Sequence, residues 1–513
     1  MVNRPLDEAD LRSRGVSQRA AEQCASVVAG LNTQDIPTQR LTSFQTRSDV
    51  MVALARENQI LISLVNQLEP GTALPAFRYL ASWCYRDEAT NGERDLGVVA
   101  KNLVGSVQRR VGSDSHPTDS NASTDLVAAT RQGVRVYQLS AAATLFELAP
   151  GPELAIWDGR EFDLKTEGLR SWQQAAAKTT SARGARLHFQ DDVRKLIRGG
   201  PGTIQSLIDL MGGGEPSDRL DVLAPTLARV PRDAGRPLWA DLVARLFVTY
   251  TLKERQRYLG LGDSHFVLFG PMALAIAPSV LAIAPSVRDV LQEGVGRMFL
   301  RQEDMRDVAT YDLASVVAQK PLSRISAREE LFGGSAFSVA DSIVPALESY
   351  FEAGRSAHPA RVLVLSTPFE DEVRAFLTRL GFAAGEVDDG GTWRPLEGDE
   401  RAFGTRPPGQ IDVLAVREDR VLVLECKAMQ PAGTLRQYVN SVHRISYSHH
   451  RNWHEKLRRK AHWVEGKLER SVDMVAFVVD RPIVIPDSDP REAGSCRIAT
   501  LDELKAALVN LSQ

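Results

Sequence analysis

Residues 409–429 read GQIDVLAVREDRVLVLECKAM, and this stretch decides the fold of the C-terminal third of the chain. Two apolar runs, 411–416 and 421–426, flank a short polar turn. Such a pattern predicts an antiparallel hairpin. Both faces of both runs are apolar, as in central strands that helices cover on each side. We therefore expect the hairpin in the middle of a covered sheet.

The turn determines which side chains of the hairpin face each other. Closure with Val416 opposite Val421 and a tighter turn centred on 418–419 give the same register. In that register Asp412 lies directly opposite Glu425, with both side chains on one face. Side chains so placed are about 5 Å apart, and like charges there are destabilising. We therefore expect a cation beside the two carboxylates.

The residue types around this pair indicate which cation it would be. Oxygen donors alone suit Mg²⁺ or Mn²⁺, bound alongside water and substrate phosphate oxygens. Strand periodicity puts Lys427 on the face of Glu425 and turns Cys426 to the opposite, buried face. An ammonium group at this place is expected to orient an attacking water and to neutralise charge on a phosphate.

A helix is predicted before the hairpin. Thr367 fits its N-cap and Pro368 its first position, and Glu370 fits the third, where its carboxylate can bond back to the N-cap amide. Gly381 is placed to end the helix. The helix also has one apolar stripe, made of Phe369, Val373, Phe376, Leu377 and Leu380.

The spacing of Asp412, twelve further residues and then Glu425-Cys426-Lys427 resembles the core of the PD-(D/E)XK nuclease superfamily, which has the restriction-endonuclease-like fold. The resemblance covers about residues 360–510, with Ile411 in place of the nominal proline. It implies that the aspartate and the glutamate ligate a metal ion and that the lysine is the catalytic lysine.

The same resemblance suggests a carboxylate on the preceding helix. In Mrr-like restriction enzymes and archaeal Holliday-junction resolvases, a glutamate lies eleven residues before a Gly–aromatic pair. Counting back from Gly381-Phe382 leads to Glu370. Glu372, which shares a helix face with Phe369, is the alternative.

A basic, aromatic segment follows the hairpin. Residues 436–470 contain nine Lys or Arg against three Glu, interleaved with two Tyr and two Trp. Such side chains neutralise phosphates and stack on bases, so the segment favours a polynucleotide partner, and the family resemblance favours DNA. A solvated helix face with inward tryptophans is the alternative. The histidines of the segment lack a complete zinc set. The candidate substrate-binding residues are Gln437, Arg444, Trp453 and Arg458.

The rest of the sequence predicts three regions. Residues 1–112 and 125–350 read as mostly helical, on either side of a polar run, with strand-like pieces at Val134–Leu139 and Leu154–Trp157. Residues 360–513 read as an α/β/α sandwich with a mixed central sheet. In that last region, residues 474–479 read as a core strand, and Thr500-x-x-Glu503 has the spacing of a capping box.

Composition narrows the classes of protein that remain. Of 513 residues, 43% are hydrophobic and 25% charged, which argues against wholesale disorder and a multi-span membrane protein. The formal net charge of −3 excludes a globally basic nucleic-acid coat. Four scattered cysteines and a charged N-terminus favour a cytoplasmic protein. The uncharged stretch 264–287 is broken by three prolines, so we expect a buried helix pair or an apolar loop and no membrane association.

Together these patterns predict a cytoplasmic nuclease that uses Mg²⁺ or Mn²⁺ to hydrolyse phosphodiester bonds, most simply a DNA endonuclease. A nuclease domain on a large extra region is similar in architecture to restriction and phage-defence effectors, an analogy only. The sequence is also compatible with a homo-oligomer. The alternative is a catalytically inactive nucleic-acid-binding or scaffold protein on the same fold.

Overall fold

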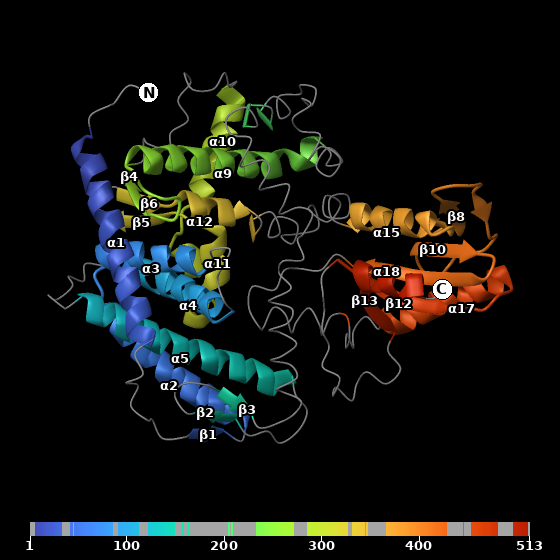
Figure 1. The fold of residues 1–513 in the computed structure, drawn as a ribbon, viewed down its shortest axis with the longest axis horizontal. Coiled ribbons are helices and arrows are strands. Elements are labelled where there is room, and N and C mark those ends of the chain that lie inside the picture. The colour runs from blue at the N-terminus through green and yellow to red at the C-terminus, as the bar shows by residue number, and fades with distance from the viewer. Residues whose placement is uncertain are drawn as a thin grey trace. The chain divides into compact units, whose positions relative to one another are not determined.

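The computed structural model divides the chain into two compact units, which are described separately (Figure 1). One unit consists of Met1–Thr166, His188–Ala224 and Arg232–Ala353, and the other of Glu167–Leu187, Pro225–Pro231 and Gly354–Gln513. The structure describes residues 6–32, 42–44, 46–85, 91–111, 122–148, 155–157, 162–164, 204–205, 207–208, 232–270, 285–326, 331–343, 345–346, 366–427, 445, 453–480 and 496–510.

The first unit is mainly helical, as the sequence predicted. Its longer helices are α1 (Glu8–Asn32), α2 (Arg47–Gln67), α3 (Pro70–Cys84), α4 (Asn91–Gln108), α5 (Ala122–Leu148), α9 (Arg232–Tyr258) and α10 (Pro285–Arg297). Its short helices are α11 (Ala314–Gln319), α12 (Ala336–Asp341) and two 3₁₀ turns, Glu303–Met305 and Thr310–Asp312. The described residues of this unit also form two small sheets. One consists of β1 (Thr42–Phe44), β2 (Ala155–Trp157) and β3 (Phe162–Leu164), and the other of β4 (Val267–Phe269), β5 (Ser323–Ser326) and β6 (Leu331–Gly334).

Two local predictions for this unit differ in outcome. The strand expected at Leu154–Trp157 is confirmed as β2. The strand expected at Val134–Leu139 is wrong, because these residues lie within α5. Val136, Leu139 and Ala143 are buried at the spacing of a helix, and α5 packs along α2. Tertiary packing therefore outweighs the β-branched composition of this segment.

The uncharged stretch 264–287 falls mostly on residues 271–284, which lie outside the described residues. Strand β4 precedes these residues, and α10 begins directly after them. None of the helices that the structure describes has both the length and the apolar character needed to cross a bilayer. The polar run between the two predicted helical regions also lies outside the described residues at 112–121, and the division at that point stays a prediction.

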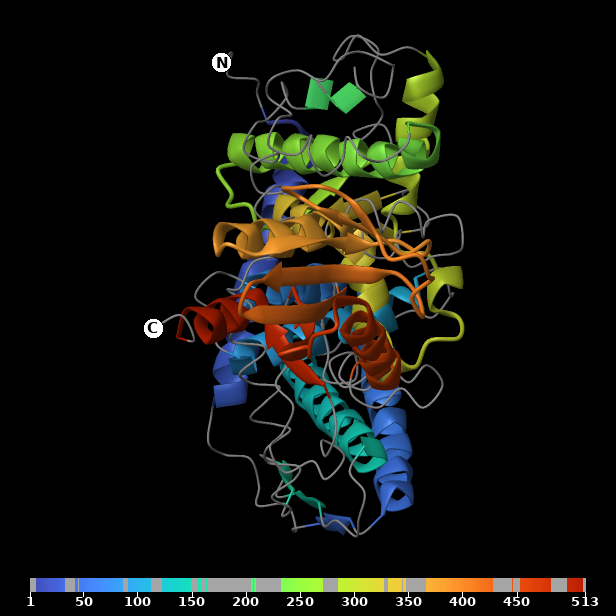
Figure 2. The ribbon, with the colours of Figure 1, turned by 90° about the vertical axis from the view of Figure 1, so that its right-hand side faces the viewer.

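The second unit is built on a mixed seven-stranded sheet, drawn in orange and red in Figure 2. The strand order is β13-β12-β11-β10-β7-β8-β9, with β11, β12 and β13 parallel and the remaining neighbours antiparallel. The strands are β7 (Ala383–Val387), β8 (Thr392–Pro395), β9 (Arg401–Ala402), β10 (Ile411–Arg417), β11 (Arg420–Lys427), β12 (Met474–Val479) and β13 (Arg497–Thr500). The predicted hairpin is thus β10–β11, near the middle of the sheet.

Helices cover both faces of this sheet. On one face, α15 (Thr367–Arg379) and α18 (Leu501–Asn510) share an apolar core with alternate residues of β10, β11 and β12. On the other face, α17 (Trp453–Leu468) packs on the intervening residues of the same strands. The central strands are therefore buried from both sides, which explains why their sequence is apolar on both faces.

The ends of the helices follow the sequence in part. Gly381 has φ +81° and donates to Thr378, and Phe382 donates to Leu377, which together end α15 as a Schellman motif. The capping box of α18 is confirmed, because Thr500 and Glu503 each accept the other's amide hydrogen. The capping box predicted for α15 is wrong. The N-cap is Ser366, which makes no side-chain cap bond, and Glu370 pairs elsewhere.

Close packing of β7 against β8 yields a stability prediction. A Cβ added at Gly385 would lie 1.9 Å from the backbone oxygen of Arg394, an atom that cannot move aside alone. Gly385→Ala should therefore lower the unfolding free energy by about 2 kcal/mol or more, measured as a lower Tm. Gly466 lies in α17 with open space around it, so Gly466→Ala should raise stability by about 0.5–1 kcal/mol. Equal effects of the two substitutions would contradict the described strand pairing.

Candidate active site

The predicted register of the β10–β11 hairpin is confirmed for residues 413–417 and 420–424. Its paired residues run from Val413 opposite Leu424 to Arg417 opposite Arg420. Asp412 lies one position beyond the last pair, where the pairing of β10 with β7 also shifts and residues 412 and 413 together oppose one residue of β7. A bulge of this kind changes the direction in which a side chain points from the strand. Here the Asp412 carboxylate turns toward β11, and its Oδ2 accepts a hydrogen bond of 2.9 Å from the Cys426 amide.

Glu425 lies between two lysines. The Lys427 Nζ is 2.8 Å from Glu425 Oε1, which confirms that these side chains share one face of β11. The Lys460 Nζ, from α17, is 2.5 Å from Glu425 Oε2. Cys426 points to the opposite face and is buried in the core under α15, as predicted. The cation expected beside the acidic pair is thus supplied in part by the protein itself.

Burial and charge set the ionisation of the two carboxyl groups in opposite directions. Burial, reinforced by the charge of Glu425, raises the pKa of Asp412 to about 7. Burial also acts to raise the pKa of Glu425, but the ammonium groups of Lys427 and Lys460 outweigh it and hold this pKa below its usual value. Glu425 is therefore the permanent anion of the pair, and Asp412 titrates near neutral pH.

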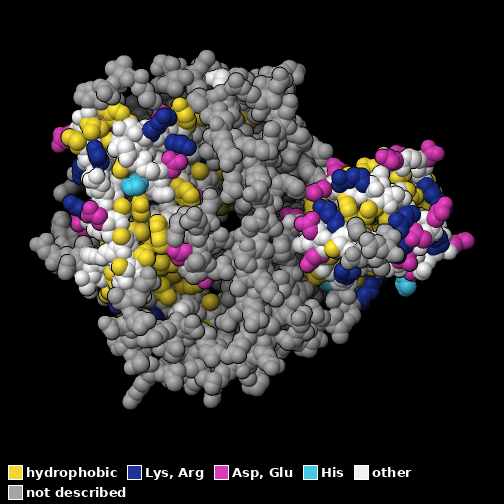
Figure 3. All heavy atoms as spheres, viewed as in Figure 1, with side chains coloured by type: hydrophobic (Ala, Val, Ile, Leu, Met, Phe, Trp, Pro, Cys, Tyr) yellow, Lys and Arg dark blue, Asp and Glu magenta, His cyan; other side chains and the backbone are white. Residues whose placement is uncertain are grey.

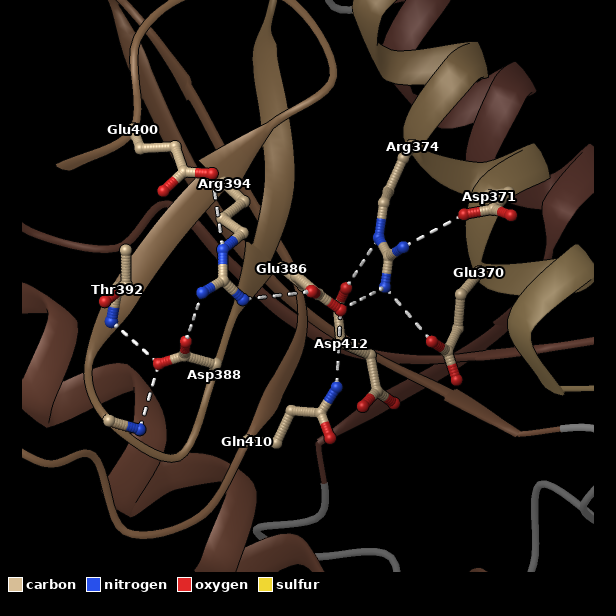
Figure 4. Close-up of polar contacts among 11 residues, drawn as sticks. Glu370, Asp371, Arg374, Glu386, Asp388, Thr392, Arg394, Glu400, Gln410 and Asp412 are labelled. Atoms are coloured by element: carbon tan, nitrogen blue, oxygen red, sulfur yellow. Dashed lines mark hydrogen bonds and ion pairs between the residues drawn. The ribbon is translucent and has the colours of Figure 1, made fainter. Parts of the chain in front are cut away.

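Arg374, on α15, connects the helix to both strands beside the site (Figure 4). Its side chain is 7% exposed. The guanidinium Nε donates to the backbone oxygen of Asp412 at 3.0 Å, and Nη2 lies 3.0 Å from Glu370 and 3.5 Å from Glu386 on β7. A buried guanidinium thus satisfies a carbonyl at the bulge. This contact positions the backbone that carries the Asp412 side chain.

Glu370 is the carboxylate of α15 that belongs to this cluster. Its charge contributes to the raised pKa of Asp412, and Lys427 acts on the pKa of Glu370 in turn. Burial, only partly offset by Arg374, raises the pKa of Glu370 above its usual value. The candidate catalytic residues Glu370, Asp412, Glu425 and Lys427 therefore lie within electrostatic reach of one another.

Sequence reasoning missed Arg374, Glu386 and Lys460. Arg374 follows Glu370 by four residues, a spacing that signals a helical ion pair. Lys460 falls on the apolar stripe of α17 with Leu457 and Val464, and a lysine on a buried stripe is itself a signal. Glu386 had no such signal, because only the sheet order places it beside Arg374.

The predicted substrate-binding residues are placed in part. Gln437 and Arg444 lie outside the described residues. The Trp453 ring lies 5.4 Å from the Lys427 Nζ, so this aromatic side chain is beside the site. Arg458 is exposed on α17. Figure 3 shows Lys and Arg interspersed with Asp and Glu on the visible face of this unit, rather than a purely basic surface.

One histidine of the basic segment has a structural role. His454 Nδ1 accepts the Cys496 amide hydrogen at 2.8 Å, and its Nε2 lies 2.7 Å from the Ile445 oxygen. With Nδ1 an acceptor, Nε2 carries the proton, and the ring is neutral. Burial keeps the pKa of His454 below its usual value. This histidine therefore fastens α17 to the start of β13 instead of binding zinc.

The donor set at the site fits a hard divalent cation. Within the part of the chain that the structure describes, no three His, Cys, Asp or Glu side chains could hold one ion together. Mg²⁺ typically uses one or two carboxylates and completes its shell with water and phosphate oxygens, and Asp412 with Glu425 match that need. Among the described residues Asp412 Oδ1 accepts no hydrogen bond, so this oxygen is open to a ligand.

Comparison with protein-family models, with curated protein sequences and with solved structures found no match to this chain. The interpretation of the site therefore rests on its residues and their geometry.

The opposed ionisation of the pair predicts how stability changes with pH. The unfolded pKa of an aspartate is about 3.9 and the folded pKa of Asp412 is about 7, so the metal-free fold loses stability as pH rises between these values. Asp412→Asn removes this loss. In EDTA, the variant should gain on the order of 2 kcal/mol over the wild type between pH 5 and pH 8, measured by thermal unfolding.

Asp419, in the exposed turn of the same hairpin, provides the control. Its hydrogen bonds with Arg417 lower the pKa of Asp419, so Asp419→Asn should bring no gain as pH rises. A constant offset between Asp412→Asn and wild type across this pH range would contradict the assigned ionisation.

Proposed function

We propose that the second unit is an α/β/α sandwich of the PD-(D/E)XK nuclease type and that the protein is a metal-dependent nuclease. One observation carries the proposal. Asp412 and Glu425 lie on adjacent strands of one hairpin, with Lys427 on the same face as Glu425 and Glu370 on the neighbouring helix. This is the set of groups, on the same elements, that the resemblance in the sequence implies.

The metal ion would be held by Asp412 and Glu425. When bound, Mg²⁺ or Mn²⁺ supplies a Lewis acid that stabilises negative charge on the phosphate. Glu425 is suited to this role because its carboxylate stays ionised, and Asp412 because a cation favours its ionised form near neutral pH.

Lys427 is suited to act on the substrate. Its side chain is 27% exposed, against 9% for Lys460, which makes it the more accessible of the two lysines at Glu425. From this position it can donate to a phosphate oxygen or orient the attacking water. Water adds to phosphorus, the bond to the leaving oxygen breaks, and that oxygen takes up a proton.

The nature of the substrate belongs to the same proposal. Trp453 beside Lys427 offers an aromatic face to a base, and the exposed Lys and Arg side chains of α17 offer charge to phosphates. The family resemblance favours DNA over RNA as the substrate. The architecture, a nuclease domain on a large extra region, favours a cytoplasmic restriction or phage-defence effector. The first unit would supply recognition, restraint or homo-oligomer contacts.

A catalytically inactive clamp on nucleic acid is the competing proposal. The double pairing of Glu425 favours it, since two lysines already balance the acidic pair without a metal ion. Lys427, the more exposed of the two lysines, supports catalysis instead. The two proposals differ in whether the bound polymer is cut.

Incubation of the purified full chain with plasmid DNA distinguishes them. We expect cleavage with Mg²⁺ or Mn²⁺, none with EDTA, and a loss of rate of at least about 10²-fold in Lys427→Ala and Asp412→Asn. Lys505→Ala, on α18 in an exposed pair with Asp502, is the matched control and should cut like the wild type. If the protein binds plasmid DNA without a metal ion and never cuts it, the clamp proposal is supported and the nuclease proposal is contradicted.

A further inference from the structure

Lys460 is a second cation at Glu425. It reaches the carboxylate from α17, 35 positions along the chain, while Lys427 reaches the other oxygen from the same strand. The Lys460 side chain is 9% exposed, against 27% for Lys427. Its neighbours on the helix, Leu457, Ala461 and Val464, are core residues. Burial among these apolar side chains and the ion pair with Glu425 restrict the movement of this ammonium.

The loop before β10 also lies beside Lys460. Gly409 has φ +113°, a backbone conformation that favours glycine, and a Cβ there would lie 3.7 Å from the Lys460 Cε. The loop backbone therefore passes close to the lysine stem. Lys460 is held between this loop and the sheet, with its charge directed at Glu425 Oε2.

Glu425 is balanced without a metal ion. This single carboxylate pairs with two ammonium groups, Lys427 at one oxygen and Lys460 at the other. A divalent cation approaching the pair is repelled by two ammonium groups that water screens poorly. A phosphodiester at the site would add negative charge and restore the attraction.

We propose that Lys460 holds the divalent-cation affinity of the free protein low, so that metal ion and polyanionic substrate bind cooperatively. This inference rests on the proposed function, because Lys460 would regulate the metal site of that function. Cooperativity is reciprocal: each partner raises the affinity for the other by the same factor. Lys460 is thus a positioning residue that acts through Glu425, and Lys427 stays available for the substrate.

Calorimetric titration of Mn²⁺ into the full chain tests the proposal without any turnover. The titration is run alone and with a cleavage-resistant phosphorothioate DNA duplex. The wild type should bind Mn²⁺ weakly alone and more tightly with the duplex. Lys460→Met, which keeps a stem of similar length, should bind Mn²⁺ about tenfold or more tightly without DNA, and the duplex should then add less.

Two variants separate charge from packing. Lys460→Arg keeps the charge and should retain the weak affinity of the wild type, and Lys505→Met removes an equal charge from α18 and should do the same. If circular dichroism shows that Lys460→Met does not fold, Lys460→Gln replaces it as the uncharged variant in the titration.

An unchanged or weaker Mn²⁺ affinity in Lys460→Met and Lys460→Gln would overturn the inference. If the wild type still cuts plasmid DNA in that case, the proposed function survives and only the role of Lys460 is lost. If the wild type neither binds Mn²⁺ with the duplex nor cuts plasmid, the proposed function and the inference fall together.

Discussion

The second unit is constrained by two carboxyl groups, Asp412 and Glu425, that are buried within electrostatic reach of each other at the end of a central hairpin. Placing charged groups away from water is costly, and two like charges make the cost larger. The fold offsets it with two ammonium groups at Glu425 and a raised pKa at Asp412. Ionisable side chains with shifted pKa values are concentrated at functional sites, which supports the proposed active site.

The surrounding elements hold this arrangement in place. A bulge turns the Asp412 side chain toward β11, and Arg374 satisfies the backbone oxygen at the bulge. The same guanidinium binds Glu370 and Glu386 and so ties α15 and β7 to the site. Arg374, Lys427 and Lys460 each pair with a buried carboxylate, so removing one of these cations would leave a carboxylate without that partner in a poorly hydrated space.

The hairpin and its register could be predicted from the sequence because side chains alternate strictly along a strand and the turn is short. That placed Glu425 and Lys427 on one face and Asp412 on the adjoining strand. The end of α15 could also be predicted, because Gly381 directly follows the apolar stripe of the helix. These features depend only on neighbours in the chain.

What the sequence did not reveal depends on which side chains pair and pack in the folded unit. Glu370 has the spacing of a capping box, but Arg374 one turn later binds its carboxylate more favourably. Val134–Leu139 has strand composition, but α2 buries one side of it as a helix. Lys460 is marked by its place on the buried stripe of α17, but its contact with Glu425 depends on how α17 packs on the sheet.

The most direct measurement is anomalous X-ray diffraction from crystals grown with Mn²⁺ and a DNA duplex. The account predicts a manganese peak bonded to carboxylate oxygens of both Asp412 and Glu425, with Lys460 still at Glu425. Side chains that point apart at these two positions, with no manganese between them, would contradict it.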